Sequence, residues 1–287
     1  MADLESSFRI HRLRKCLCGS DAFDLVFEYR EAPVGEIRFP FSASGSYRRE
    51  VVRCRTCGHF MSFHEMDTTG LYGGDYVNST YGNDSGLRKN FERIVNLAPE
   101  KSDNTGRVTK VCEFGKVYLS GGIANAKILD VGSGLCVFLF RMKQEGWNCT
   151  ALDPDPRSCR HAREIAGVSA ICGDFMAVNE PGHFDAISFN KVLEHVEDPI
   201  AMLRKARDYL APGGFVYVEL PDGEAASQAG QSREEFFIDH LHIFSAASFS
   251  LMVERAGFTL LNLERLREPS TKFTLRGFAI PKLEMDT

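Results

Sequence analysis

The feature that most constrains the fold is a regular alternation of apolar and amphipathic segments from residue 126 to about 280. Seven apolar runs, such as KILDV (127–131) and FVYVEL (215–220), have the length of buried strands, and most are followed by a segment with helical periodicity. Strands that alternate with helices predict a mainly parallel sheet covered on both faces. The last two runs, 258–266 and 272–280, are separated by a short turn, which predicts an antiparallel hairpin at the sheet edge.

Composition and charge argue against several classes of protein. Hydrophobic residues at 44% and charged residues at 25% are ordinary for a soluble globular protein, and a net charge of −5 is unlike that of a dedicated nucleic-acid binder. No run approaches the roughly 18 apolar residues of a membrane span. The first residues resemble no signal peptide, so we expect a cytoplasmic protein without membrane contact. An odd count of nine cysteines argues against a disulfide framework.

Three regions differ in composition. Residues 1–68 contain two pairs of cysteines and short strand-like runs, DLVFEY and EVVRC, and we interpret them as a separate small module. Residues 69–125 begin with a segment rich in Gly, Tyr and Asn and continue as the helical-looking LRKNFERIVNLA, which predicts a linker or a cap over the substrate. Residues 126–287 form the main α/β domain.

The paired cysteines predict a structural zinc ribbon. Two close pairs of thiolates supply the four corners of a tetrahedron, and a glycine after each pair relieves crowding where the backbone turns around the metal. The intervening segment, with FPFSASGSYRREVV, is suited to a hairpin that brings the pairs together. The alternative is four reduced core cysteines, since the first spacing is C-x-C; His59 and His64 are spare candidate ligands. The predicted ligands are Cys16, Cys18, Cys54 and Cys57.

The charge balance of this module argues against nucleic acid as a partner. A small basic cluster lies at residues 9, 12, 14 and 15, but residues 1–70 contain ten Lys and Arg against ten Asp and Glu. Binding to phosphates requires an excess of positive charge. We therefore expect a small-molecule partner, while the sequence leaves the oligomeric state open.

A glycine turn follows the first strand of the main domain. Gly132 and Gly134 let a ligand approach the backbone closely, and Asp153, at the end of the next strand, is placed to accept hydrogen bonds from ribose hydroxyls. A dinucleotide site would share these features, but its third glycine is replaced by Val137. Asp130, just before the turn, has the wrong charge for a pyrophosphate. It suits a ligand with a cationic amino group, such as S-adenosylmethionine.

These motifs resemble the class I S-adenosylmethionine-dependent methyltransferases over residues 126–280. The resemblance implies a Rossmann-like, doubly wound sheet, and Cys136 occupies the position of the third glycine in the family's first motif. FDAISFNKVLEHVEDP and LAPGGFVYVELP match later motifs of the family. By this resemblance Asp153 binds the ribose, Asp174 the adenine amino group and Phe175 the adenine ring. The predicted cofactor-binding residues are Asp130, Gly132, Ser133, Gly134, Asp153, Pro154, Asp174, Phe175, Asn190 and Lys191.

Methyl transfer to a hydroxyl requires a base near the methyl group. EEFFIDHLHIFS follows a strand and a polar loop, so it is placed to fold over the site. His240 and His242 have imidazoles suited to proton abstraction near neutral pH, and in an extended segment both would face the same side. Asp239 is a candidate to orient one ring. The alternative for either histidine is a buried structural role.

The cysteine module, the LYGGDYVNST segment and DHLHIFS together are similar to zinc-ribbon sugar methyltransferases, notably nucleotide-sugar C-methyltransferases. The resemblance implies that Asp239 and His240 form an acid–histidine pair with His240 as the base, and that Tyr76 or Tyr81 assists. Phe237 and Ile243 depart from the family pattern, and its further C-terminal domain is not found here. We therefore predict O-methylation of a sugar or related metabolite, with sugar C-methylation or RNA or protein methylation as alternatives.

One further pair of residues is a candidate site. We predict a helix over 193–210, and Glu194 and His195 lie at its start. In ubiquinone-type O-methyltransferases a comparable acid–histidine pair holds a divalent metal, but the further acids of such a site are not identifiable here. We favour the interpretation that His195 lines the pocket.

Overall fold

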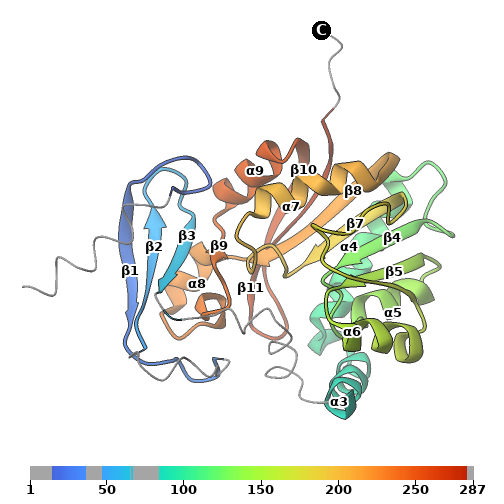
Figure 1. Ribbon diagram of the computed structural model, residues 1–287, viewed down its shortest axis with the longest axis horizontal. Helices are drawn as coiled ribbons and strands as arrows, with labels where there is room; N and C mark the ends of the chain where they lie inside the picture. The colour runs from blue at the N-terminus through green and yellow to red at the C-terminus, as the bar shows by residue number, and fades with distance from the viewer. Residues whose placement is uncertain (1–14, 37–46, 65, 67–83, 283–287) are drawn as a thin grey trace, which may run out of the picture.

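The structure is a computed structural model that describes residues 15–36, 47–64, 66 and 84–282 (Figure 1). It contains two β-sheets. A four-stranded sheet built mainly from the N-terminal residues lies beside a seven-stranded sheet that is covered by helices. Among the described residues, no helix combines the length and the apolar character needed to cross a membrane.

The seven-stranded sheet has the strand order β10-β11-β8-β7-β4-β5-β6, and the five strands from β8 to β6 are parallel. β10 and β11 form an antiparallel hairpin at one edge. The predicted α/β class, with its mainly parallel sheet and edge hairpin, is confirmed. The strands are β4 (Lys127–Val131), β5 (Asn148–Asp153), β6 (Ser169–Cys172), β7 (Phe184–Asn190), β8 (Leu210–Pro221), β10 (Phe258–Arg267) and β11 (Phe273–Pro281).

Helices cover both faces of this sheet because the strands bury side chains on both sides. Leu129 of β4 packs in one core with α7 (Pro199–Lys205) and α9 (Ala246–Arg255). Its neighbour Ile128 packs in the opposite core, to which α3 (Asp84–Val95), α4 (Asp103–Tyr118) and α5 (Val137–Gln144) contribute buried side chains. Figure 1 shows α7 and α9 together on one side of the sheet. The remaining helical elements are η2 (Pro99–Lys101), α6 (Pro156–His161), η3 (Ala162–Ala166), η4 (Ala206–Tyr209), α8 (Gly223–Ala229) and η5 (Glu234–Phe236).

The order of strands reverses at β4. The chain runs from β4 outward through β5 and β6, then returns to β7 on the other side of β4. In open parallel sheets ligands bind at such a reversal, outside the carboxyl ends of the strands. The glycine turn after β4 and the residues after β7 are therefore at the expected place for a ligand.

The four-stranded sheet joins two distant parts of the chain. β1 (Phe23–Tyr29), β2 (Arg49–Cys54) and β3 (Phe60–His64) form an antiparallel meander, and β9 (His242–Ile243) pairs with β3. The predicted strands DLVFEY and EVVRC are thus present, while FPFSASGS lies outside the described residues. Because β9 belongs to the segment DHLHIFS, the N-terminal strands lie directly beside that candidate site segment.

The prediction of one helix over 193–210 is wrong for residues 193–198 and for Leu210, which begins β8. α7 begins only at Pro199, and the side chain of Asp198 caps it by accepting a hydrogen bond from the Ala201 amide. Proline lacks an N–H and favours the first position of a helix, so Asp198-Pro199 is a start signal. Glu194 and His195 consequently lie in the turn between β7 and α7.

Candidate functional site

The glycine turn after β4 has the backbone geometry that its sequence predicts. Gly132 and Gly134 have φ values of 68° and 50°, and Cys136, at the start of α5, has φ 59°. A Cβ on Gly132 would lie 2.8 Å from Cγ2 of Val192, so only glycine fits at this position. The turn is retained with Cys136 in a left-handed conformation.

Asp130 is the buried acid of this turn. Its side chain is 2% exposed, and Oδ1 accepts hydrogen bonds of 2.7 Å from both Ser188 Oγ and Asn190 Nδ2. Burial raises the pKa of Asp130 to about 7, although the two hydrogen bonds oppose this shift. Asn190 Oδ1 is itself buried and has no hydrogen-bond partner among the described residues. The site therefore combines an acid and an orphan acceptor, which suits a ligand with cationic N–H groups.

Asp153 ties the end of β5 to the glycine turn. Oδ2 accepts a hydrogen bond of 2.8 Å from the Gly134 amide, and Oδ1 accepts one of 2.9 Å from the Asp155 amide. A carboxylate has about four lone-pair positions, so it retains capacity for ribose hydroxyls. Burial raises its pKa. Ser133 Oγ, in the same turn, is buried without a hydrogen-bond partner among the described residues, and Pro154 is exposed beside Asp153.

The two residues predicted to contact adenine, Asp174 and Phe175, differ in their exposure. Asp174 is exposed, and its Oδ1 accepts a hydrogen bond of 2.9 Å from the Met176 amide. Phe175 is 2% exposed and packs edge-on against Phe189 with ring centroids 5.8 Å apart. Asp174 thus remains available to a ligand, while Phe175 packs mainly into the core.

The Lys191 side chain reaches a buried charged cluster that sequence reasoning missed. Its Nζ lies 2.9 Å from Thr274 Oγ1 and 4.0 Å from Glu219. Arg107 of α4 binds Glu219 with two hydrogen bonds of 2.8 and 2.5 Å. Burial alone would raise the pKa of Glu219, but Arg107 holds it at about 2. A single acid inside the apolar run FVYVEL was the signal for this cluster.

A second titratable group lies beside that cluster. Glu268, at the turn of the edge hairpin, is 6% exposed. Burial raises its pKa to about 7, and the negative charge of Glu219 adds to the shift. Lys191, directly after β7, and Glu219, near the end of β8, thus place charged groups at the carboxyl ends of these two strands.

His240 lies in the segment that the sequence analysis placed over the site. Its Nδ1 is 2.8 Å from the Glu235 carbonyl oxygen, and its ring centroid is 4.9 Å from that of His195. A carbonyl only accepts hydrogen bonds, so Nδ1 bears the proton and Nε2 has the lone pair. Burial lowers the pKa of His240. The imidazole is therefore neutral at pH 7, as a base or a metal ligand must be; its role as the base stays a prediction.

His242 has a different environment from His240. Its Nδ1 lies 3.0 Å from Nε2 of the fully buried His59, and its Nε2 lies 3.3 Å from the Glu197 carbonyl oxygen. Both of its ring nitrogens are thus engaged inside the protein. We retain His240 in the candidate site and assign His242 to the contact between β3 and β9.

Asp239 and the Glu194–His195 pair surround His240. The Asp239 carboxylate oxygen Oδ2 lies 3.8 Å from His195 Nδ1, and the Asp239 carbonyl oxygen accepts a hydrogen bond of 2.8 Å from the same nitrogen. One side-chain ligand atom each from Glu194, His195 and His240 lies within 4.8 Å of the others. The structure thus brings together two motifs that the sequence analysis treated separately.

A buried ion pair of the N-terminal strands holds the segment before His240. Arg49 and Glu36 have side chains that are 0% and 1% exposed, with Nη2 and Oε1 3.0 Å apart. Arg49 donates a hydrogen bond of 2.5 Å to the Phe236 carbonyl, and Glu36 accepts one of 2.7 Å from the Ile238 amide. The Arg49–Glu36 pair therefore fixes the backbone at Phe236 and Ile238, just before Asp239 and His240.

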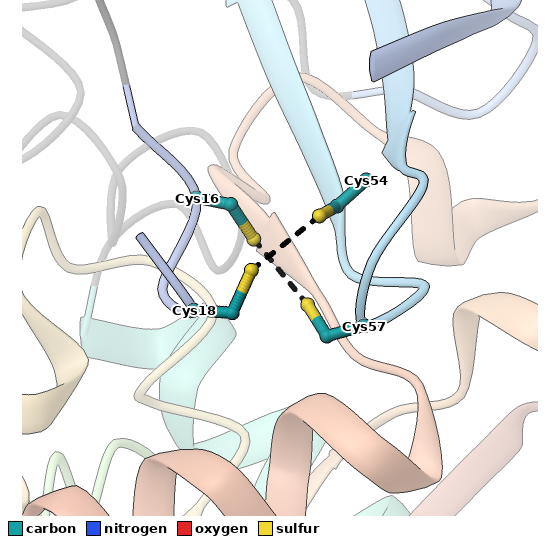
Figure 2. A group of neighbouring side chains, drawn as sticks. All are labelled: Cys16, Cys18, Cys54 and Cys57. Carbon is teal, nitrogen blue, oxygen red and sulfur yellow. Dashed lines mark hydrogen bonds between the residues drawn. The ribbon is translucent and has the colours of Figure 1, made fainter. Parts of the chain in front are cut away.

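The four paired cysteines converge on one point (Figure 2). Sγ of Cys16 lies 3.4 Å from that of Cys57, Sγ of Cys18 lies 3.6 Å from that of Cys54, and all four lie within 4.8 Å of one another. Zinc bonds of about 2.3 Å in a tetrahedron place sulfurs about 3.8 Å apart, so the set fits this ion. None of the four is in a disulfide. Gly19 and Gly58, which follow the pairs, have φ values of 90° and 71°.

The predicted tyrosines cannot be placed. Tyr76 and Tyr81, with the whole LYGGDYVNST segment, lie outside the described residues. The remaining candidate residues form three groups: the acid and glycine turn at β4 and β5, the histidine cluster after β7, and the cysteine cluster of the N-terminal residues.

Comparison with known proteins points to one family. The family described as "Methyltransferase domain" matches residues 87–263, more than half of the chain. The ubiquinone biosynthesis O-methyltransferase of Xanthomonas campestris pv. campestris (strain B100) is 33% identical over 110 residues, which cover 35% of this chain and 46% of that protein. The corresponding enzyme of Pseudomonas aeruginosa (strain UCBPP-PA14) is 33% identical over 104 residues, 34% of this chain and 45% of that protein. The matched region is about half the length of these curated relatives.

A solved structure shows the same fold. The magnesium protoporphyrin IX methyltransferase of Synechocystis PCC 6803, crystallised with bound SAH, superimposes with a TM-score of 0.56. The superposition covers 75% of this chain and 100% of that chain at 14% sequence identity. At this level of sequence identity the superposition shows a shared fold and does not identify the methyl acceptor.

Proposed function

Because the chain belongs to the methyltransferase-domain family, we propose that it transfers a methyl group from S-adenosylmethionine to an oxygen atom of a small molecule. Membership of the family confirms the sequence-based prediction of a methyltransferase. We assign the place of the cofactor, the acceptor and the residues that act on it from the geometry of the site.

The observation that carries the proposal is the polar environment around Asp130. S-adenosylmethionine supplies an already activated methyl group when bound, and it has a ribose and a cationic amino group but no phosphate. A buried carboxylate at Asp130 and the orphan acceptor Asn190 Oδ1 match the amino group. Asp153 matches the ribose hydroxyls, and the bare backbone at Gly132 and Gly134 allows close approach. A phosphate-containing dinucleotide would be repelled by Asp130.

Proton removal from the acceptor depends on His240. This residue lies in the segment after β8, at the same edge of the sheet as the glycine turn, and its neutral imidazole presents Nε2. The Arg49–Glu36 pair and the β3–β9 contact hold this segment in place. The alignment of acceptor, methyl group and proton acceptor is the main contribution a protein makes to such a transfer.

Within this proposal we place the acceptor among sugars or sugar-containing metabolites. The support is the combination of a four-cysteine cluster, an acid–histidine pair in DHLHIFS and a methyltransferase fold in one chain. The curated relatives support transfer to oxygen, since their names describe O-methyltransferases. A phenolic acceptor is the second candidate, because those relatives act in ubiquinone biosynthesis by name.

We further propose that the cysteine cluster holds a structural zinc ion and that residues 1–68 form a ribbon, with residues 69–125 as a substrate cap. Four thiolates close the coordination shell and leave no position for an acceptor. The ribbon's contribution to the reaction would be to support β3, and through β3 the His240 segment.

The test is a comparison of cofactor binding and turnover. A panel of nucleotide sugars, free sugars and phenols is incubated with S-adenosylmethionine labelled in its methyl group, and labelled products are identified by mass spectrometry. His240→Ala should keep the cofactor Kd and lose turnover, whereas His183→Ala, a substitution distant from the site, should keep both. Normal turnover by His240→Ala would refute its assignment. Labelling of phenols alone would replace the sugar proposal, and labelling of no acceptor would reject both.

A further inference from the structure

We propose that Lys191 and Glu268 bind two neighbouring hydroxyl groups of the methyl acceptor and so select an acceptor with a vicinal diol. Lys191 directly follows β7, and Glu268 lies at the turn between β10 and β11. Sequence reasoning assigned Lys191 to the cofactor and gave Glu268 no role. The inference rests on the proposed function and narrows it, because sugars are the common metabolites that carry vicinal hydroxyls.

The strongest support is the state of the Glu268 carboxyl group. The residue is 6% exposed, yet its side chain has no hydrogen bond or ion pair within the ranges that the structure describes. Its backbone is fixed, because the Glu268 amide donates a hydrogen bond of 2.8 Å to the Lys272 carbonyl oxygen and its own carbonyl accepts one of 2.8 Å from the Thr271 amide. Burial raises the pKa of Glu268 to about 7. Buried polar groups are normally hydrogen-bonded, so this carboxyl indicates a ligand that donates hydrogen bonds.

Lys191 is held in an uncommon backbone conformation. Its φ is 59°, in the left-handed region that residues other than glycine seldom adopt, and its amide donates a hydrogen bond of 3.0 Å to the Glu219 carbonyl oxygen. Nζ donates a hydrogen bond of 2.9 Å to Thr274 Oγ1, while the Glu219 carboxylate lies 4.0 Å away, beyond hydrogen-bond distance. An ammonium group has three N–H donors, so the described residues leave two of them to a ligand. Backbone strain of this kind is concentrated at ligand sites.

The charges around the two side chains favour a neutral ligand. Arg107 and Glu219 neutralise each other through two hydrogen bonds, and Asp103 is bound to the hairpin turn by two more. The positive charge of Lys191 lowers the pKa of Glu268, although no ion pair within 4.0 Å joins these two described residues. Their charges cancel when Glu268 is ionised. An anionic or cationic group bound between them would therefore leave a net charge in a largely buried site, whereas hydroxyl groups would not.

Hydrogen-bond chemistry and position both assign the pair to the acceptor. A carboxylate only accepts hydrogen bonds and an ammonium group only donates them, whereas a hydroxyl group does both. One hydroxyl therefore accepts from Lys191 while its neighbour donates to Glu268. Asp153, the acid that we assign to the cofactor's ribose, lies at the end of β5, and β4 separates that strand from β7. The pair lies on the β8 side of β4, and the chain continues from β8 into the segment with His240.

The experiment pairs protein variants with sugars that lack single hydroxyls. Calorimetry measures binding of glucose, galactose, mannose, their nucleoside diphosphate forms and the deoxy derivatives of each to the full chain, with and without the demethylated cofactor. Loss of either recognised hydroxyl should weaken binding to wild type about 10-fold or more, since hydrogen bonds to charged groups are strong. Glu268→Met should reduce this penalty to less than about 3-fold for one hydroxyl, and Lys191→Met should do so for its neighbour. Glu113→Met and Lys116→Met, exposed on α4, are the matched controls and should bind like wild type.

Thermal melting separates ligand binding from a structural role. Glu268→Met removes a buried acid without a partner, so it should melt no lower than wild type. Lys191→Gly adopts φ 59° without strain and should also melt no lower, while it loses sensitivity to its hydroxyl. The inference is overturned if both variants keep the wild-type penalties, if the two affected hydroxyls are not neighbours, or if no sugar binds. Failure of sugars to bind would leave methyl transfer to a phenol unaffected, whereas sugar binding without cofactor binding would reject the proposed function and retain this site.

Discussion

Replacing Arg49 by methionine should destabilise the protein and should also disturb the position of the segment that contains His240. Arg49 is completely buried, bound to Glu36, and its guanidinium also lies 4.1 Å from the centroid of the Tyr29 ring. Methionine fills a similar volume but leaves the Glu36 carboxylate without its counter-charge. It also removes the donor to the Phe236 carbonyl.

The magnitude follows from the burial of the pair. Removing one partner of a buried ion pair costs about 3–5 kcal/mol, because the remaining charge stays out of water without compensation. Typical domains have about 5–15 kcal/mol of stability, so the loss is a large fraction of the total. Glu36→Gln alone should cost a comparable amount. The double variant should cost about 2 kcal/mol less than the sum of the two, since contacting residues couple by about 0.5–3 kcal/mol.

Urea unfolding followed by circular dichroism measures these free energies. The matched control is Arg55→Met, which breaks a pair in the same module whose side chains are 63% and 59% exposed, and which should cost less than about 1 kcal/mol. In buffer, Arg49→Met should lower kcat while the cofactor Kd stays unchanged. Equal losses of stability in Arg49→Met and Arg55→Met would refute the energetic argument. A normal kcat in folded Arg49→Met would refute the argument that this pair positions His240.

Four further predictions concern the cofactor turn and the cysteine cluster. The pKa of Asp130 is raised to about 7 in the folded chain by burial, so cofactor affinity should weaken up to about tenfold per pH unit below 7, and Asp130→Asn should be weak and nearly independent of pH. Because this pKa is raised on folding, the cofactor-free protein should lose stability as pH rises from about 4 to 7, and calorimetric melting of Asp130→Asn should show a flatter profile. Gly132→Ala places a side chain at φ 68° and 2.8 Å from Val192, so it should cost about 2 kcal/mol or more, while Gly121→Ala, with no atom within 4 Å of the new Cβ, should melt almost like wild type. Cys57→Ser should reduce zinc content by metal analysis and lower both Tm and turnover, whereas Cys172→Ser, exposed and outside the cluster, should change none of them. Unaltered zinc content in Cys57→Ser would contradict the cluster's assignment.

Much of the fold could be predicted because it depends on local patterns. Seven apolar runs specified the strands of the main sheet, and the glycine turn after Val131 specified where a ligand approaches it. The order of the strands was not explicit in the sequence, but alternating strands and helices leave few topologies. The predicted start of this helix is wrong because it follows apolar periodicity alone, whereas Asp198-Pro199 is the local signal at which α7 begins.

The histidine cluster could not be predicted because it is made by long-range contacts. Glu194 and His240 are 46 positions apart in the sequence, and they meet because of hydrogen bonds between the turn after β7 and the strand that joins β3. The same holds for Arg49, whose role is apparent only where its side chain reaches the backbone of Phe236. The Cys pairs were easier to interpret, since their spacing and following glycines are local.

Isothermal calorimetry with S-adenosylmethionine and with its demethylated product tests the central claim most directly. Wild-type protein should bind one molecule of either per chain, and Asp130→Asn should bind both much more weakly at pH 8. Absence of heat and of any thermal shift with either compound at millimolar concentration would contradict the assignment of a cofactor site to the turn between β4 and α5.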